Sequence, residues 1–155
     1  MTTPQAAGPL VIASCSRRKT AATEPVPALD LYQGGCIPAL RARVTGRPAL
    51  RARVRIISAE HGLLHADTPV LPYDRRMDAR RALALRAPVD EALQSEWLLN
   101  GRPREVLVIA GPLYMLALAG LYLVLGPVWV RWISDPGTGW PEATAILDDW
   151  SWPCP

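Results

Sequence analysis

The stretch VRIISAEHGLLHADTPVLPYDRRM, residues 54–77, decides the fold of this 155-residue chain. Its first four residues are rich in β-branched side chains, which is typical of a buried strand. Residues 58–77 contain Pro69 and Pro72, which lack an N–H and fix φ, so this segment forms neither a long helix nor a central strand. A long charged loop that leaves the carboxyl end of a buried strand is where α/β proteins place their sites. The stretch therefore predicts a pocket beside this strand.

Further strands and helices are predicted on both sides of this stretch. Because strands alternate with helices, we expect one three-layer α/β domain over residues 1–155, with a small, mostly parallel, Rossmann-like sheet between helices. Residues 1–8 are expected to be flexible, and residues 135–155 to form a C-terminal helix and tail. Strands are expected at Leu10–Ser14, Val54–Ser58, Val106–Ala110 and near Val128–Ile133, and helices at Pro38–Val44, from Asp78 to about Leu99, at Leu113–Leu125 and at Pro141–Trp150.

The longest predicted helix has recognisable ends. Asp78 is expected to be its N-cap, and Gly101 is expected to close it. Pro88 lies inside it and is expected to kink or break the helix, because proline lacks the N–H that bonds to the preceding turn.

Positive charge is concentrated in the first two thirds of the chain. Residues 1–104 hold sixteen of the seventeen basic side chains and nine acidic ones, whereas residues 105–155 hold only Arg131 against five acidic ones. This asymmetry predicts a surface for nucleic acid or phosphate. An alternative remains open, since every basic residue except Lys19 is arginine, and GC-rich coding also produces chains rich in Ala, Pro and Arg.

One uncharged run is long enough to span a bilayer: the twenty-five residues Val106–Val130. Gly111-Pro112 and Gly126-Pro127 cut this run into shorter pieces. A buried strand, a turn and a buried helix of an α/β core explain the run as well, so we expect no membrane span.

The cysteines indicate the redox compartment. Cys15, Cys36 and Cys154 form no CxxC motif, and any disulfide scheme leaves one of them unpaired. A reducing environment fits this pattern best, and the N-terminus lacks the pattern of a signal peptide. We therefore expect a cytoplasmic protein.

The carboxyl ends of parallel strands meet at one edge of a sheet, so the residues that follow three of the predicted strands are expected to form one site. After the third strand, the Gly111-Pro112 pair lets the backbone approach a ligand, and Tyr114 can stack on it or form a hydrogen bond. The candidates are Ser14, Cys15, Ser16, Arg17 and Lys19 after the first strand, Ser58, Glu60, His61, Tyr73 and Asp74 after the second, and Gly111 and Tyr114 after the third.

Several of these candidates have an ordinary structural alternative. Residues 16–19 can hold an anion through backbone N–H groups and cations, or can be a solvated basic loop, and they lack the glycine spacing of a Walker motif. Cys15 can be a nucleophile, although a buried cysteine at a strand end is usually inert packing. Asp74 can be catalytic, or it can be a paired carboxylate that caps the turn into the next helix.

A metal site is not indicated, although Glu60 and His61 followed by His65 resemble a ligand set superficially. Ligands at this spacing meet only on a helix, and Gly62 breaks a helix at this point. We expect neither a metal nor a cofactor.

Four segments together resemble an uncharacterised bacterial domain family: SCSRRK after the first strand, ALDLYQG at residues 28–34, IISAEHGLL, and PYDRRM. More distantly, the chain resembles the peroxide-stress protein (YaaA-like) family, in which this region is thought to lie in a positively charged DNA-binding cleft. A related domain in archaeosine-type transglycosylases is described as uracil-DNA-glycosylase-like. The resemblance therefore implies a uracil-DNA-glycosylase-like fold as the alternative to a Rossmann-like one. The chain departs from the peroxide-stress pattern at His61 and at Asp74, where that family has Tyr and Arg. The resemblance marks Lys19, Asp30, Tyr32, Gly34, Ser58, Gly62, Pro72, Tyr73 and Asp74 as site residues.

The resemblance and the residue chemistry together suggest an enzyme that handles nucleobases or nucleotides and cleaves or exchanges an N-glycosidic bond. Such cleavage builds positive charge on the sugar as the base leaves, so a carboxylate near the sugar and a proton donor near the base are needed. The candidate roles are charge stabilisation or water activation by Asp74 or Glu60, protonation of the base by His61, phosphate binding by Lys19 with Arg17 or Arg18, and base stacking by Tyr32, Tyr73 or Tyr114.

The competing class is a non-catalytic protein that binds DNA or a nucleotide and is linked to stress protection. In that class His61 and Asp74 are structural hydrogen-bond partners. A catalytic pair requires a carboxylate and an imidazole that both face open space near the phosphate-binding turn. The sequence leaves the oligomeric state open.

Overall fold

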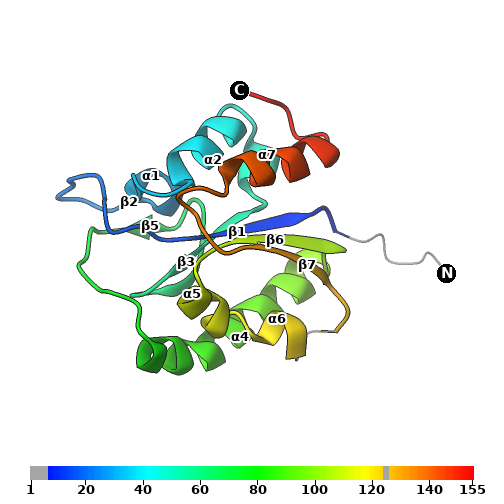
Figure 1. Cartoon of the computed structure of the whole chain (residues 1–155). Coiled ribbons are helices and arrows are strands. Elements are labelled where there is room, and N and C mark those ends of the chain that lie inside the picture. The colour runs from blue at the N-terminus through cyan, green and yellow to red at the C-terminus, as the bar shows by residue number, and fades with distance from the viewer. Residues whose placement is uncertain (1–6, 124–125) are drawn as a thin grey trace.

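A five-stranded sheet with the order β4-β3-β1-β6-β7 forms the centre of the molecule in the computed structural model, which describes residues 7–123 and 126–155 (Figure 1). Four strands run parallel, and β4 pairs antiparallel with β3 at one edge. A separate two-stranded ribbon pairs β2 with β5. The strands are β1 (Leu10–Ser14), β2 (Val26–Pro27), β3 (Val54–Ser58), β4 (Gly62–His65), β5 (Pro69–Val70), β6 (Glu105–Ile109) and β7 (Trp129–Ile133).

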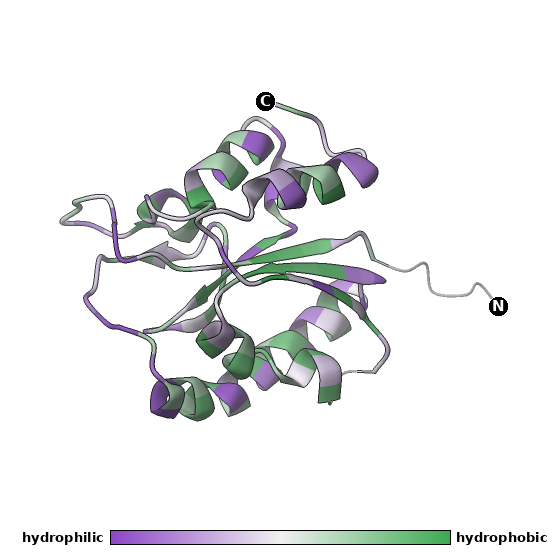
Figure 2. Cartoon of the chain, in the orientation of Figure 1, coloured by the Kyte–Doolittle hydropathy of each residue, from purple (hydrophilic) through white to green (hydrophobic). Residues whose placement is uncertain are grey.

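Helices cover both faces of this sheet (Figure 1). Along β1 the side chains alternate between the two layers: Val11 and Ala13 belong to one hydrophobic core, and Leu10 and Ile12 to the other. Figure 2 shows the most hydrophobic residues in these central strands. One face carries α1 (Ala28–Leu31), α2 (Ile37–Val44), α3 (Pro48–Arg51) and α7 (Trp140–Asp149), and the other carries α4 (Ala79–Asn100), α5 (Pro112–Ala117) and α6 (Gly120–Leu123).

The predicted three-layer α/β fold is therefore confirmed, with strands and most helices close to their expected positions. Asp78 is the N-cap of α4, since its side chain accepts a hydrogen bond from the N–H of Arg81 at 2.7 Å. Gly101 ends the helix with a φ of 83°. The expected break at Pro88 is wrong, because α4 continues through it; Pro88 is exposed, so the carbonyl that loses its partner faces water.

The loop after β3 contains a strand that the sequence pattern did not reveal. The chain turns back after three residues and forms β4, which begins at Gly62 with a φ of 73°. Arg55 on β3 is buried, and its guanidinium binds both carboxylate oxygens of Glu96 at 2.7 Å. A charged pair of this kind lies inside the layer between β3 and α4.

The long uncharged run of residues 106–130 is divided between β6, α5, α6 and the start of β7. The single helix expected at residues 113–125 is two short helices, and positions 124–125 lie outside the described residues. Among the described helices, none has the length and apolarity that crossing a bilayer requires. The flexibility expected for residues 1–8 falls mostly outside the described residues, and Ala7 forms a bridge with Pro103.

Candidate functional site

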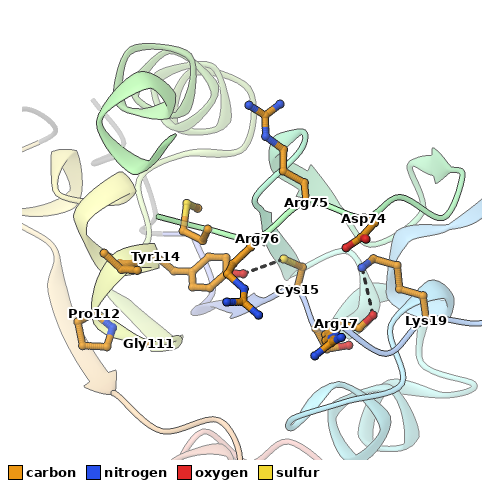
Figure 3. Close-up of a pocket in the computed structure, with 12 residues that line it drawn as sticks. Cys15, Arg17, Lys19, Asp74, Arg75, Arg76, Gly111, Pro112 and Tyr114 are labelled. Carbon is orange, nitrogen blue, oxygen red and sulfur yellow. Dashed lines mark hydrogen bonds between the residues drawn. The ribbon is translucent and has the colours of Figure 1, made fainter. Parts of the chain in front are cut away.

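A pocket of about 450 Å³ lies at the carboxyl edge of the sheet (Figure 3). Three segments form its wall: the loop after β1, the turn before α4, and the start of α5. These are the positions where the strand ends were expected to converge. The lining residues are Cys15, Ser16, Arg17, Lys19, Asp74, Arg75, Arg76, Met77, Gly111, Pro112, Leu113 and Tyr114.

The lining carries four cations and one carboxylate, Asp74. One cation is partly neutralised, since Arg75 lies 3.4 Å from the carboxylate of Glu60. Arg17, Lys19, Arg76 and Asp74 make no ion pair with any residue in the described part of the chain. In Figure 3 the side chain of Arg75 points away from the centre of the pocket. The pocket therefore favours an anionic ligand.

The loop after β1 is held against the segment before α2. The hydroxyl of Ser16 accepts a hydrogen bond from the N–H of Gly34 at 3.0 Å and donates to the carbonyl of Arg18 at 2.7 Å. A Cβ at position 34 would lie 2.9 Å from the Cβ of Ser16, which explains why glycine stands there. This contact fixes the backbone from which Arg17 and Lys19 project.

Lys19 is placed above aromatic rings. Its amine lies 4.4 Å from the ring centroid of Tyr73 and 5.8 Å from that of Tyr32, and it donates to the carbonyl of Arg17 at 3.3 Å. A cation over an aromatic face is attracted by the ring quadrupole. The amine is thus held near the pocket, and it makes no other hydrogen bond within the described part of the chain, so its other N–H donors are available to a ligand.

Three hydroxyl groups form a chain behind this amine. The hydroxyl of Tyr73 lies 2.6 Å from that of Ser58 and 2.8 Å from that of Tyr32. Burial raises the pKa of both tyrosines, so both phenols stay neutral. Tyr32 and Ser58 are fully buried, and their side chains support the site from behind rather than facing the pocket.

Cys15 and Tyr114 meet in the pocket although 99 residues separate them. The Cys15 Sγ lies 3.2 Å from the Tyr114 hydroxyl, and the N–H of Ala59 donates to the same sulfur at 3.5 Å. Burial raises the pKa of Tyr114, so its hydroxyl stays protonated and can donate a hydrogen bond.

Two of the three predicted catalytic residues do not line the pocket. Glu60 pairs with Arg75, and the exposed His61 packs edge-on against Tyr73 with ring centroids 5.3 Å apart. The backbone explains this placement: the N–H groups of Glu60 and His61 both donate to the Ser58 hydroxyl in the tight turn before β4. Asp74 is the predicted catalytic residue that lines the pocket.

The remaining predicted residues have simpler positions. Ser14 is buried at the end of β1. Gly62 packs on α4, where a Cβ would lie 3.6 Å from Val89. A Cβ at Gly111 would meet nothing within 4 Å, so that side of the pocket is open and crowding does not explain the glycine.

Five residues of the lining were not predicted from the sequence to be site residues: Arg75, Arg76, Met77, Pro112 and Leu113. Their position in the sequence could have indicated them, because each lies within three residues after a predicted site residue, either Asp74 or Gly111. Arg18, named as a phosphate ligand, lies outside the lining. Across residues 7–123 and 126–155, no three side chains of His, Cys, Asp or Glu are grouped to hold a metal ion.

The fold and the pocket together define a three-layer α/β protein with a cationic site at the carboxyl edge of its sheet. A family model described as "Family of unknown function (DUF6884)" matches residues 10–125, and the chain belongs to this family. The match contains all three segments that line the pocket. No curated protein and no solved structure matches the chain significantly.

Proposed function

We propose that the protein is an enzyme that binds a nucleotide, free or within a nucleic acid, and cleaves or exchanges its N-glycosidic bond. The observation that carries this proposal is Asp74, a carboxylate without an ion pair among the described residues, in a pocket lined by four cations. Asp74 is exposed and makes no ion pair among the described residues, so its carboxylate contributes little to stability and is available to a ligand.

The cations of the pocket are proposed to bind the phosphate group of the nucleotide. Arg17, Lys19 and Arg76 have no carboxylate partner among the described residues and can each bind phosphate oxygens. The pocket volume of about 450 Å³ lies within the range of small-molecule sites. Met77, Leu113 and Tyr114 provide apolar and aromatic surface for a base.

In this proposal, the carboxylate of Asp74 acts next to the sugar of the nucleotide. As the base leaves, positive charge develops on the sugar, and a nearby carboxylate stabilises it or removes a proton from the attacking water. Tyr114 replaces His61 as the hydrogen-bond donor to the leaving base, because Tyr114 lines the pocket whereas His61 does not.

A second candidate is the non-catalytic binding of DNA or a nucleotide, which the distant likeness to the peroxide-stress family supports. One specific observation favours it: the imidazole of His61 lies outside the lining, so the carboxylate–imidazole pair expected for catalysis is missing from it. Under both candidates we place the protein in the cytoplasm, in keeping with Cys15, Cys36 and Cys154, which are all free thiols.

The test is a mass-spectrometric screen for free base. Purified protein is incubated with nucleosides, nucleotides and modified single- and double-stranded DNA, and Asp74→Asn is compared with Glu91→Gln, which removes an exposed carboxylate from α4. We expect base release by the wild type and by Glu91→Gln, and loss of release in Asp74→Asn. No release from any substrate would reject the enzyme and leave the binding protein.

A further inference from the structure

We infer that Tyr73 is a positioning residue that fixes both Lys19 and Asp74 in the pocket, so that the phosphate group of a nucleotide is bound at a set place relative to the carboxylate. This inference deepens the proposed function and rests on it for the identity of the ligand. It gives Tyr73 a different role from the base stacking that its sequence suggests.

The turn that carries Asp74 has few other attachments. Residues 71–78 belong to no helix or strand. Among the described residues, no backbone–backbone hydrogen bond joins residues 71–77 to the rest of the chain. Their polar contacts are the hydroxyl of Tyr73 and the ion pair of Arg75 with Glu60, and Met77 adds a buried apolar side chain. The hydroxyl of Tyr73, next to Asp74 in the sequence, therefore makes the main polar contacts between this turn and the rest of the protein.

The direction of the hydrogen bonds strengthens this attachment. The Ser58 hydroxyl accepts two N–H groups, from Glu60 and His61, which occupies both of its lone pairs. Ser58 then donates its own proton to Tyr73, whose hydroxyl also lies 2.8 Å from that of Tyr32, where either hydroxyl can be the donor. Tyr73 is thus the middle member of a part-buried chain of hydrogen bonds, in which each bond constrains the next.

The same ring holds Lys19. Its amine lies 4.4 Å from the ring centroid of Tyr73, and the backbone of Lys19 forms an antiparallel bridge with Tyr32. The hydrogen bonds of the hydroxyl fix the Tyr73 ring, and the ring attracts the Lys19 amine. Tyr73 therefore sets the positions of both Lys19, from the loop after β1, and Asp74, in the turn before α4. Figure 3 shows Lys19 and Asp74 on the same side of the pocket.

The chain offers a selective probe, because Lys19 is its single lysine. Reductive methylation with ¹³C-formaldehyde labels Lys19 and the N-terminal amine and keeps the lysine charge. In the wild type the Lys19 methyl signal is expected upfield, since it lies over an aromatic face. The variant Tyr73→Phe keeps the ring and removes the hydroxyl, and Tyr122→Phe on α6 is the matched control, because Tyr122 is exposed and far from these contacts in sequence.

We expect Tyr73→Phe to move the Lys19 signal toward its position in unfolded protein. The affinity of the Tyr73→Phe variant for inorganic phosphate, measured by titration on the Lys19 methyl signal, should be about three- to tenfold lower than that of the wild type. This loss corresponds to one or two net hydrogen bonds. Tyr122→Phe should change neither. An unchanged signal and affinity in folded Tyr73→Phe would overturn the inference.

If Tyr73→Phe does not fold, Tyr32→Phe decides, because it removes the hydroxyl at the end of the chain of hydrogen bonds and keeps the bond from Ser58 to Tyr73. A smaller change in the same direction supports the inference, and no change overturns it. Failure of the proposed function is a separate result: absence of base release with a normal response of Lys19 to phosphate would reject the glycosidic activity and keep the positioning role.

Discussion

Removing single cations from the pocket should weaken phosphate binding in an order that the ion pairs determine. Arg76 lines the pocket without a carboxylate partner among the described residues, Arg75 lines it but pairs with Glu60 at 3.4 Å, and Arg18 lies outside the lining. We therefore expect Arg76→Gln to have the largest effect, Arg75→Gln a smaller one, and Arg18→Gln the smallest.

The magnitude follows from Coulomb's law. Two unit charges 4 Å apart interact by about 1 kcal/mol in bulk water and about 4 kcal/mol at the effective dielectric constant near a protein surface. The pocket is open to solvent, so we expect Arg76→Gln to cost about 1–2 kcal/mol, which corresponds to about a five- to thirtyfold weaker Kd.

The assay is isothermal titration of inorganic phosphate and of a nucleoside 5′-monophosphate at low ionic strength, repeated at higher salt to measure screening. Arg18→Gln is the matched control, because it removes the same charge from the β1 loop without touching the pocket. Equal losses in Arg18→Gln and Arg76→Gln would refute a shaped site and indicate binding by diffuse surface charge.

Three further predictions concern buried groups. Glu96→Leu should lower the free energy of unfolding in urea by about 3–5 kcal/mol, because it leaves the buried Arg55 without its carboxylate; a loss below about 1 kcal/mol would contradict this. Burial raises the pKa of Cys36 to about 12, so iodoacetamide should label it in urea and spare it in the native protein, and rapid native labelling would disprove its burial. Burial also raises the pKa of Tyr73 and Tyr114 above the value of 10.0 in unfolded chains, so the stability present below pH 10 should fall as the pH rises above it; constant urea midpoints across this range would argue against the effect.

The central strands could be predicted because their residues face apolar layers on both sides. All five residues of β1 and of β3 are buried, and both strands are mostly apolar, with Ser14 in β1 and Arg55 and Ser58 in β3 as the polar residues. The N-cap at Asp78 was predictable because capping depends on local geometry alone. The edge strand β4 was not predictable, because it has only four residues and begins at Gly62 within a charged segment that has the composition of a loop.

The position of the site was also predictable, because the topology of a parallel sheet brings its strand ends together. The roles of single residues within it were not. The turn between β3 and β4 directs the backbone N–H groups of Glu60 and His61 onto Ser58 and leaves their side chains outside the pocket lining. The contact between Cys15 and Tyr114 likewise depends on packing between distant segments, which no local pattern records.

One comparison tests most directly whether Asp74 acts chemically on a ligand that the cations bind. Wild type and Asp74→Asn are each saturated with the nucleotide that the screen identifies, and the rate of base release and the Kd are measured on the same preparations. We predict that the variant releases base at least about a hundredfold more slowly, as expected for loss of a group that stabilises developing charge, and binds the ligand as tightly or more tightly because a repelling carboxylate is gone. Weaker binding together with an undiminished rate of release in Asp74→Asn would contradict the account.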